Sequence, residues 1–103
     1  MTTPTNAVPT EAERAAFTAR LQREGYDEIL TKTIEPDVSI DRHVHPYDVL
    51  ALVLDGEATI DCGQGARTYR PGDVLEVARD VPHTERYGPR GYTFLLGRRH
   101  GAA

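Results

Sequence analysis

The feature that most limits what this chain can fold into is a series of short apolar runs, broken by turn residues, that fills the chain after Gly25. The runs are rich in β-branched and aliphatic residues, and the breaks contain Gly, Pro and Asp, which is typical of strands joined by tight turns. The runs span residues 28–35, 38–45, 49–54, 57–62, 66–69, 74–77, 83–87 and 92–97. About eight short strands predict a small antiparallel barrel or sandwich, and therefore an all-β domain.

One run is expected at the centre of the sheet. Residues 49–54 are apolar at every position, which predicts a strand that is covered on both faces. One face would line the barrel interior, and the other would contact the helix, a second sheet or a second subunit. Asp55-Gly56 follows directly, and we expect a two-residue hairpin there, because a type I′ turn needs positive φ at both central residues.

A single helix is predicted over residues 10–24, before the strands begin. Thr10 and Glu13 match the S/T-x-x-E capping box, in which each side chain accepts a hydrogen bond from the other residue's backbone amide. Gly25 follows as a helix-ending residue. The apolar stripe, which includes Leu21, is short, so we expect this helix to pack on the outside of a larger body.

Composition excludes several classes of function. The net charge is −4 and the basic residues are scattered, which differs from the basic stripe of a nucleic-acid-binding protein. No apolar stretch approaches the ~20 residues of a membrane span, and residues 1–9 lack the basic start and apolar centre of a secretory signal. We therefore expect a cytoplasmic protein without nucleic-acid or membrane partners, with residues 1–9 as a disordered tail and residues 10–100 as one domain. Cys62 is the only cysteine, and we expect it to be a small buried residue.

Three of the four histidines belong to two of the predicted strands. His43 and His45 are two residues apart, so a strand would place both rings on one face. An H-x-H pair alone is weak evidence for a metal site, although imidazoles this close repel when protonated and gain little from packing. His83 supplies a third ring at the start of another strand, whereas His100 lies near the chain end and is expected to be unrelated. Three converging imidazoles can bind a divalent metal and leave positions open for water or substrate.

Two longer motifs contain these histidines. They are HVHPYDVLALVLDGE, at residues 43–57, and RPGDVLEVARDVPHTERYG, at residues 70–88. Together they resemble the two motifs of the cupin superfamily, and the resemblance covers about residues 28–97. It implies a small single-domain cupin, that is, a jelly-roll β-barrel that is often dimeric and holds one metal in its mouth. With the predicted helix, the expected fold is an all-β jelly-roll barrel with one short N-terminal α-helix.

The resemblance also implies the ligand set. Carried over residue by residue, it makes His43, His45 and His83 the metal ligands, but the glutamate of the cupin pattern falls on Val49. Asp48 is the neighbouring carboxylate, and it would become a fourth ligand only if a β-bulge turned it inward; otherwise it caps the start of the strand. With three neutral imidazoles a divalent metal keeps its full charge, which favours an anionic or enolisable chelating substrate.

Two turns also depart from the cupin pattern. Glycines of that pattern are replaced here by Asp37 and Asp80. Aspartate tolerates positive φ better than most residues, so we expect both turns to form.

Three further residues are candidates for the wall of the pocket. Glu85 and Tyr87 would share a face with His83 if their strand is straight. A buried Glu85 would serve as a general base and Tyr87 would donate a hydrogen bond to substrate. The alternatives are that Glu85 pairs with a nearby arginine and that Tyr87 is a packing residue of the barrel. Tyr47, beside His45, would line the entrance.

These observations lead to two hypotheses about function. In the first, the protein is a metal-dependent enzyme, a dioxygenase or an isomerase or lyase, that acts on a small polar chelating or enolisable molecule. Its cofactor would be a divalent transition metal, one of Fe, Mn, Ni, Zn or Cu. In the second, the protein is a non-catalytic ligand-binding or sensory cupin. In both, the resemblance favours a homodimer that binds a small molecule.

Overall fold

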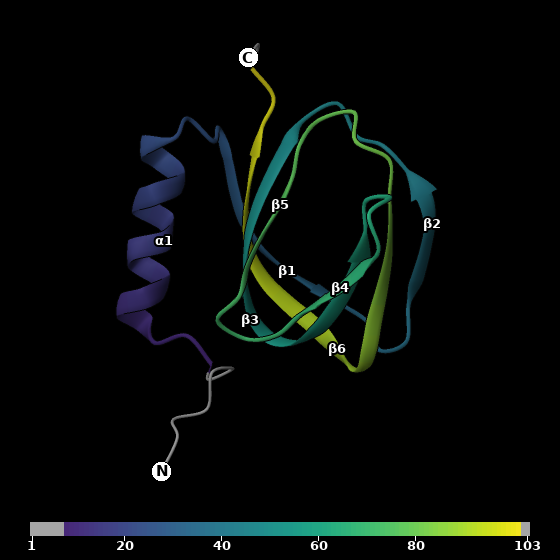
Figure 1. Cartoon of the computed structure of the whole chain (residues 1–103). Helices are drawn as coiled ribbons and strands as arrows, with labels where there is room; N and C mark the ends of the chain where they lie inside the picture. The colour runs from purple at the N-terminus through teal and green to yellow at the C-terminus, as the bar shows by residue number, and fades with distance from the viewer. Residues whose placement is uncertain (1–7, 102–103) are drawn as a thin grey trace.

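The computed structural model describes residues 8–101 and contains one helix followed by six strands. The elements are α1 (Glu11–Arg23), β1 (Glu28–Ile34), β2 (Ser39–His43), β3 (Asp48–Asp61), β4 (Ala66–Tyr69), β5 (Val74–Val77) and β6 (His83–Arg99). All strand pairs are antiparallel, in the order β1-β6-β3-β4, with β2 also paired to β6 and β5 also paired to β3. The strands curve around a common interior, with α1 outside and β2 on the side away from the helix (Figure 1). The predicted all-β jelly-roll fold with one helix is confirmed.

The predicted hairpin at Asp55-Gly56 is wrong. β3 continues through these two residues as one strand, although Gly56 does have a positive φ of 76°. The reason lies in the partner strand: Gly56 pairs with Tyr92 of β6, whereas Ala58 pairs with Tyr87. The extra residues of β6 between these two pairs form a bulge, so β3 and β6 bend together instead of reversing. Two pairs of predicted strands therefore merge into the long strands β3 and β6.

The centre of β3 is covered on both faces, as predicted. Val49, Ala51 and Val53 belong to an interior core, which also contains Tyr92 and Leu96 of β6. The alternate residues of β3 belong to a second core outside the barrel, formed by Leu50, Leu52, Leu95, Tyr26 and, from α1, Phe17 and Leu21. Side chains alternate between the two faces of a strand, so one fully apolar run serves both cores. The outer face of β3 is therefore covered by the helix, one of the three possibilities that the sequence left open.

Helix α1 begins with the expected capping box. The Thr10 hydroxyl accepts from the Glu13 amide at 3.1 Å, and the Glu13 carboxylate accepts from the Thr10 amide at 2.8 Å. Leu21 is fully buried against the sheet. Most of the tail predicted for residues 1–9 lies outside the described residues. Within the described residues no helix is long and apolar enough to cross a membrane.

Two local predictions had different outcomes. Asp37 and Asp80 both adopt positive φ, at 60° and 62°, which confirms that aspartate supports these two turns. Cys62, which was expected to be buried, is exposed, because β3 ends at Asp61 and the next residues form a surface loop.

Gly56 gives a direct test of the bend. A Cβ at this position would lie 2.0 Å from the carbonyl oxygen of Gly91, so Gly56→Ala adds a steric clash to the cost of positive φ. We expect it to lower the free energy of unfolding by about 3 kcal/mol or more, measured by urea denaturation.

Gly63→Ala is the matched control. Gly63 also has positive φ, 96°, but a Cβ there would meet no atom within 4 Å, so a loss of only about 1 kcal/mol is expected. Equal losses in the two variants would contradict the close approach of Gly56 to the Gly91 carbonyl.

Candidate metal centre

Three histidine rings converge at one end of the barrel. The ligand atoms that His43, His45 and His83 offer all lie within 4.8 Å of one another. The ring centroid of His83 lies 4.3 Å from that of His43 and 4.9 Å from that of His45. His83 is almost completely buried, at 3% exposure, whereas the other two are half-buried. The structure therefore brings together the three histidines that the sequence singled out.

The backbone explains why these residues meet. His43 is the last residue of β2 and pairs directly with His83, the first residue of β6, after a register shift in β2. His45 lies beyond the end of β2, so strand alternation, on which its prediction was based, does not place it. Its carbonyl instead accepts a hydrogen bond of 3.0 Å from the amide of Asp80, which ties this loop to the turn before His83.

Each ring is oriented by a nearby backbone carbonyl. The Nδ1 atoms of His43, His45 and His83 lie 2.8, 3.1 and 2.9 Å from carbonyl oxygens, which belong to Asp41, Tyr47 and Val81. A carbonyl oxygen only accepts, so each Nδ1 is a protonated donor, and Nε2 is the nitrogen that each ring has left for the cluster. Hydrogen bonds of this kind fix the tautomer and the orientation of metal-binding histidines. Three neutral nitrogen donors in this arrangement fit a divalent transition metal.

Glu85 lies beside the histidines rather than with an arginine. Its Oε2 atom lies 3.0 Å from Nε2 of His43 and 3.2 Å from Nε2 of His83. Its other oxygen, Oε1, accepts a hydrogen bond from the Tyr87 hydroxyl. His83, Glu85 and Tyr87 alternate along β6, so all three face the interior as expected for one face of a strand.

Burial keeps the neighbouring groups in defined protonation states. Burial, together with the hydrogen bond to Glu85, raises the pKa of Tyr87 far above its usual value, so its hydroxyl stays protonated and remains a donor. Burial also lowers the pKa of His45, reinforced by the neighbouring His83 and His43, which favours the neutral ring. The ring of Tyr47 stacks on His45 at a centroid distance of 4.5 Å. Tyr47 therefore limits the movement of one histidine at the entrance.

A cavity of about 330 Å³ opens beside the histidines. Its walls include all the candidate site residues except Asp48, together with apolar side chains from β1, β3, β5 and β6. Two basic residues that no sequence motif marked as site residues, Lys32 and Arg98, also line the cavity. The sequence does contain a signal for both residues, because each lies an even number of positions from apolar residues of the interior face. A charged residue in an amphipathic strand, however, normally indicates the face that contacts solvent.

Comparison with known proteins supports the same interpretation. Residues 30–87, more than half of the chain, match the family described as "Cupin domain". The chain belongs to the cupin family. No curated protein matches this cupin.

Several solved structures have a similar fold. A protein of unknown function from Rhizobium leguminosarum bv. viciae 3841 has a TM-score of 0.66 and 18% identity, covering 71% of this chain and 69% of that chain. An uncharacterized conserved protein with a double-stranded β-helix domain, from Klebsiella pneumoniae, has a TM-score of 0.59 and 26% identity, covering 73% and 68%. The DMSP lyase DddQ from Ruegeria pomeroyi DSS-3 has a TM-score of 0.62 and 25% identity; the match covers 69% of this cupin but only 36% of the lyase.

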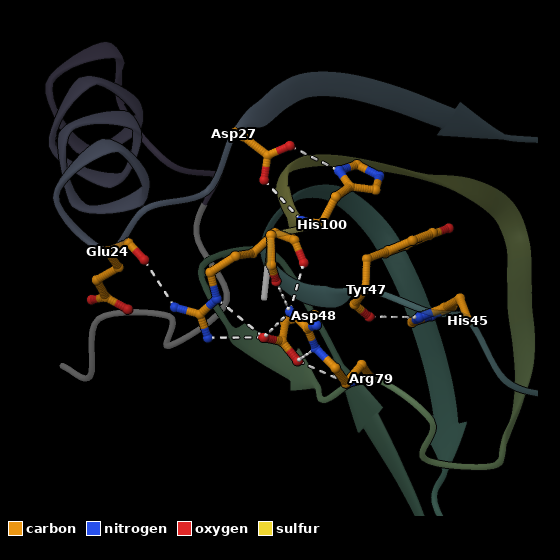
Figure 2. Close-up of polar contacts among 9 residues, drawn as sticks. Glu24, Asp27, His45, Tyr47, Asp48, Arg79 and His100 are labelled. Atoms are coloured by element: carbon orange, nitrogen blue, oxygen red, sulfur yellow. Dashed lines mark hydrogen bonds and ion pairs between the residues drawn. The ribbon is translucent and has the colours of Figure 1, made fainter. Parts of the chain in front are cut away.

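Asp48, considered above as a fourth ligand, is directed to a different cluster (Figure 2). It is buried at 8% exposure, and its Oδ1 accepts from the Arg79 amide at 2.8 Å. Its Oδ2 accepts from Nε and Nη2 of Arg99 at 3.1 and 3.0 Å. Arg99 in turn donates to the carbonyl of Glu24 at the end of α1. Asp48 thus joins three distant segments, and its oxygens are occupied by arginines rather than by the histidine site.

The ion pairs of Asp48 predict a pH-dependent contribution to stability. The hydrogen bond from the Arg79 backbone amide, with those from the side chains of Arg79 and Arg99, lowers the pKa of Asp48 to about 2. A depressed folded-state pKa stabilises the protein above the unfolded-state pKa of about 3.9, and this contribution is lost as the pH falls through about 2. We expect Asp48→Asn to lower the free energy of unfolding at pH 7 by about 2 kcal/mol.

The measurement is urea denaturation in the presence of chelator at pH 7, 4 and 2.5. The gap between wild type and Asp48→Asn is expected to narrow at the lowest pH, whereas Glu35→Gln, which neutralises an exposed carboxylate, is expected to have little effect. A gap that stays constant over this range would contradict the role assigned to Asp48.

Proposed function

We propose that His43, His45 and His83 bind one divalent transition metal, drawn from Fe, Mn, Ni, Zn and Cu. The support is the convergence of the three rings and the three carbonyl hydrogen bonds that occupy each Nδ1, so that Nε2 is the nitrogen each ring offers to a metal. The cupin membership of the chain supports the same assignment.

We further propose that this cupin catalyses proton abstraction next to a carbonyl or carboxylate group, as an isomerase or lyase does. The observation that supports this reaction class over oxygen-dependent cleavage is the position of Glu85, a carboxylate at the histidine site with an oxygen 3.0 Å from His43. A general base must lie within reach of both the substrate proton and the group that stabilises the resulting charge. The similarity to a DMSP lyase, at 25% identity, is consistent with a lyase.

Each residue then has a defined role. Glu85 takes the proton from the carbon, and the electron pair left behind moves onto the adjacent carbonyl oxygen to give an enolate. The proton returns at a neighbouring carbon in an isomerisation, or a leaving group departs with the electron pair in an elimination. A bound divalent metal supplies Lewis-acid stabilisation of negative charge on oxygen. The Tyr87 hydroxyl holds Oε1 of Glu85, so that Oε2 faces the histidines.

Metal binding can be tested with the four histidines of the chain. We expect the wild-type protein to bind one metal ion per chain, with thermal unfolding shifted upward by several degrees at saturating metal. His43→Ala, His45→Ala and His83→Ala are each expected to weaken binding by more than about 100-fold, because each removes a ligand. His100→Ala is the control, since His100 contacts Asp27 and lies outside the cluster. Unchanged affinity in all three cluster variants would remove the proposed metal site.

The proposed chemistry can be tested by exchange of substrate protons with solvent. Metal-loaded protein is incubated in D₂O with a panel of small carboxylic and keto acids, and loss of the carbon-bound proton is followed by NMR. We expect Glu85→Gln to slow exchange by about 10²–10⁴-fold with metal affinity retained, because the amide cannot accept the proton. Tyr87→Phe, which keeps the ring but not the donor, is expected to slow exchange much less.

The other outcomes are distinguishable. Oxygen consumption without deuterium incorporation would favour a dioxygenase, and binding with neither would favour a sensory cupin; both would contradict proton abstraction. Loss of metal from Glu85→Gln would make Glu85 a ligand instead of a base.

Two further proposals concern the state of the protein in the cell. We propose a homodimer, supported by Ile40 and Val44, two apolar side chains exposed on and next to the edge strand β2. Sedimentation analysis tests this, and a monomer at micromolar concentration would contradict it. A cytoplasmic location is supported only by the presence of a single, exposed cysteine, which suits a reducing compartment.

A further inference from the structure

Arg98 stands out because part of its guanidinium group is buried without a hydrogen-bond partner. Among the described residues, its Nε is the one buried side-chain nitrogen or oxygen that lacks such a partner. Buried donors are nearly always satisfied, and the described part of the chain supplies no acceptor for this one. The other known contacts of Arg98 are weak: Nη1 lies 3.5 Å from Oε1 of Glu28, and the guanidinium lies 5.3 Å from the centre of the Tyr47 ring.

Lys32 reaches the same cavity from a different strand. It pairs with Phe94 across β1 and β6, and Arg98 lies four residues further along β6. Leu30 and Ile34, the neighbours of Lys32 with the same strand parity, both pack against the interior core, so this face of β1 is the inner one. Lys32 is the only lysine in the chain; it is exposed, shares the inner-face parity of Leu30 and Ile34, and lines the cavity.

The charge of the cavity differs in sign from that of the protein. The whole chain has a net charge of −4. The cavity is lined by two cationic side chains, Lys32 and Arg98, and by one carboxylate, Glu85. A bound divalent metal adds to this positive charge. Such a local field concentrates anions within a protein that repels them elsewhere.

We propose that Arg98 and Lys32 bind the carboxylate of a small organic acid and that this acid is the substrate of the histidine site. The inference rests on the proposed function, because it names the substrate class of the same cavity. The planar guanidinium of Arg98 lines the cavity and matches a carboxylate with two parallel hydrogen bonds. The ammonium of Lys32 adds a second positive charge.

The remaining wall favours an organic acid over an inorganic anion. Ile34, Phe94 and Leu96 also line the cavity, so a ligand that fills it needs a hydrocarbon part. The volume of about 330 Å³ lies at the lower end of the usual range for ligand pockets, about 300–1,000 Å³, which suits a small molecule. Binding of its carboxylate at Arg98 and Lys32 would leave the rest of the molecule free to reach Glu85.

The test compares succinate with succinamide, its uncharged analogue, by isothermal titration calorimetry at fixed ionic strength, on metal-loaded and on chelator-treated protein. We expect succinate to bind at least 10-fold more tightly than succinamide in both forms. Lys32→Gln and Arg98→Gln are each expected to weaken succinate binding about 5- to 20-fold. Arg23→Gln, which removes the same charge from the exposed side of α1, is expected to leave it unchanged. In the exchange assay, both cavity variants are expected to raise KM more than they lower kcat.

The results separate this inference from the proposed function. Equal affinity for succinate and succinamide, or succinate binding that neither cavity variant weakens, would overturn the carboxylate site. Tighter binding of inorganic phosphate than of succinate would overturn the choice of an organic acid. Succinate binding as expected in chelator-treated protein, together with no metal binding and no deuterium exchange, would uphold the carboxylate site while the proposed function fails. Arg98→Lys keeps the positive charge but cannot form two parallel hydrogen bonds to one carboxylate. Weaker succinate binding by this variant than by wild type would support bidentate binding.

Discussion

The pairing of β6 with three other strands is the interaction on which the rest of this structure depends. β6 forms antiparallel ladders with β1, β2 and β3, and its inner face supplies His83, Glu85, Tyr87 and Arg98 to one cavity. Because side chains alternate along a strand, the register of these ladders decides which groups share the interior. A shift of one residue would move the carboxylate and the arginine to the outer face and leave His43 without its partner His83. The site is thus a property of strand register more than of any one loop.

The sequence predicted most of the fold because much of the relevant information is local. The capping box of Thr10 and Glu13, the doubly buried run at residues 49–54 and the positive φ of Asp37 and Asp80 all depend on neighbouring residues or on simple periodicity. The bend at Asp55-Gly56 was mistaken for a hairpin because both structures require a residue with positive φ. The choice between them is made by Gly91, thirty-five positions away, whose carbonyl packs against Gly56. Local turn propensity does not contain that information.

The same division applies to the candidate site. The histidines were identified from spacing and from resemblance to cupins, and the structure brings the three rings together. The orienting carbonyls, however, follow from loop conformation, and His45 reaches the cluster from outside its strand. Lys32 and Arg98 were not predicted as site residues. Strand periodicity shows which residues share a face of the strand, but when that face carries both charged and apolar residues it does not show whether the face points into the barrel. Whether these positions line a cavity depends on the closure of the whole barrel.

Two carboxylates show how the surroundings assign different roles to one chemical group. Asp48 and Glu85 are both shielded from solvent, and both were considered as functional residues on sequence grounds. Asp48 is held by two arginines, which satisfy its oxygens and fix its charge, so it serves to join α1, β3 and the end of β6. Glu85 accepts a hydrogen bond from Tyr87 on Oε1, and its Oε2 lies beside Nε2 of His43 and His83, so its carboxylate belongs to the histidine cluster in the cavity. A carboxylate whose charge is compensated by two arginines stabilises a fold, whereas one that lines a pocket without an arginine or lysine partner is suited to accept a proton. It is this difference in partners that makes Glu85, and not Asp48, the base of the proposed reaction.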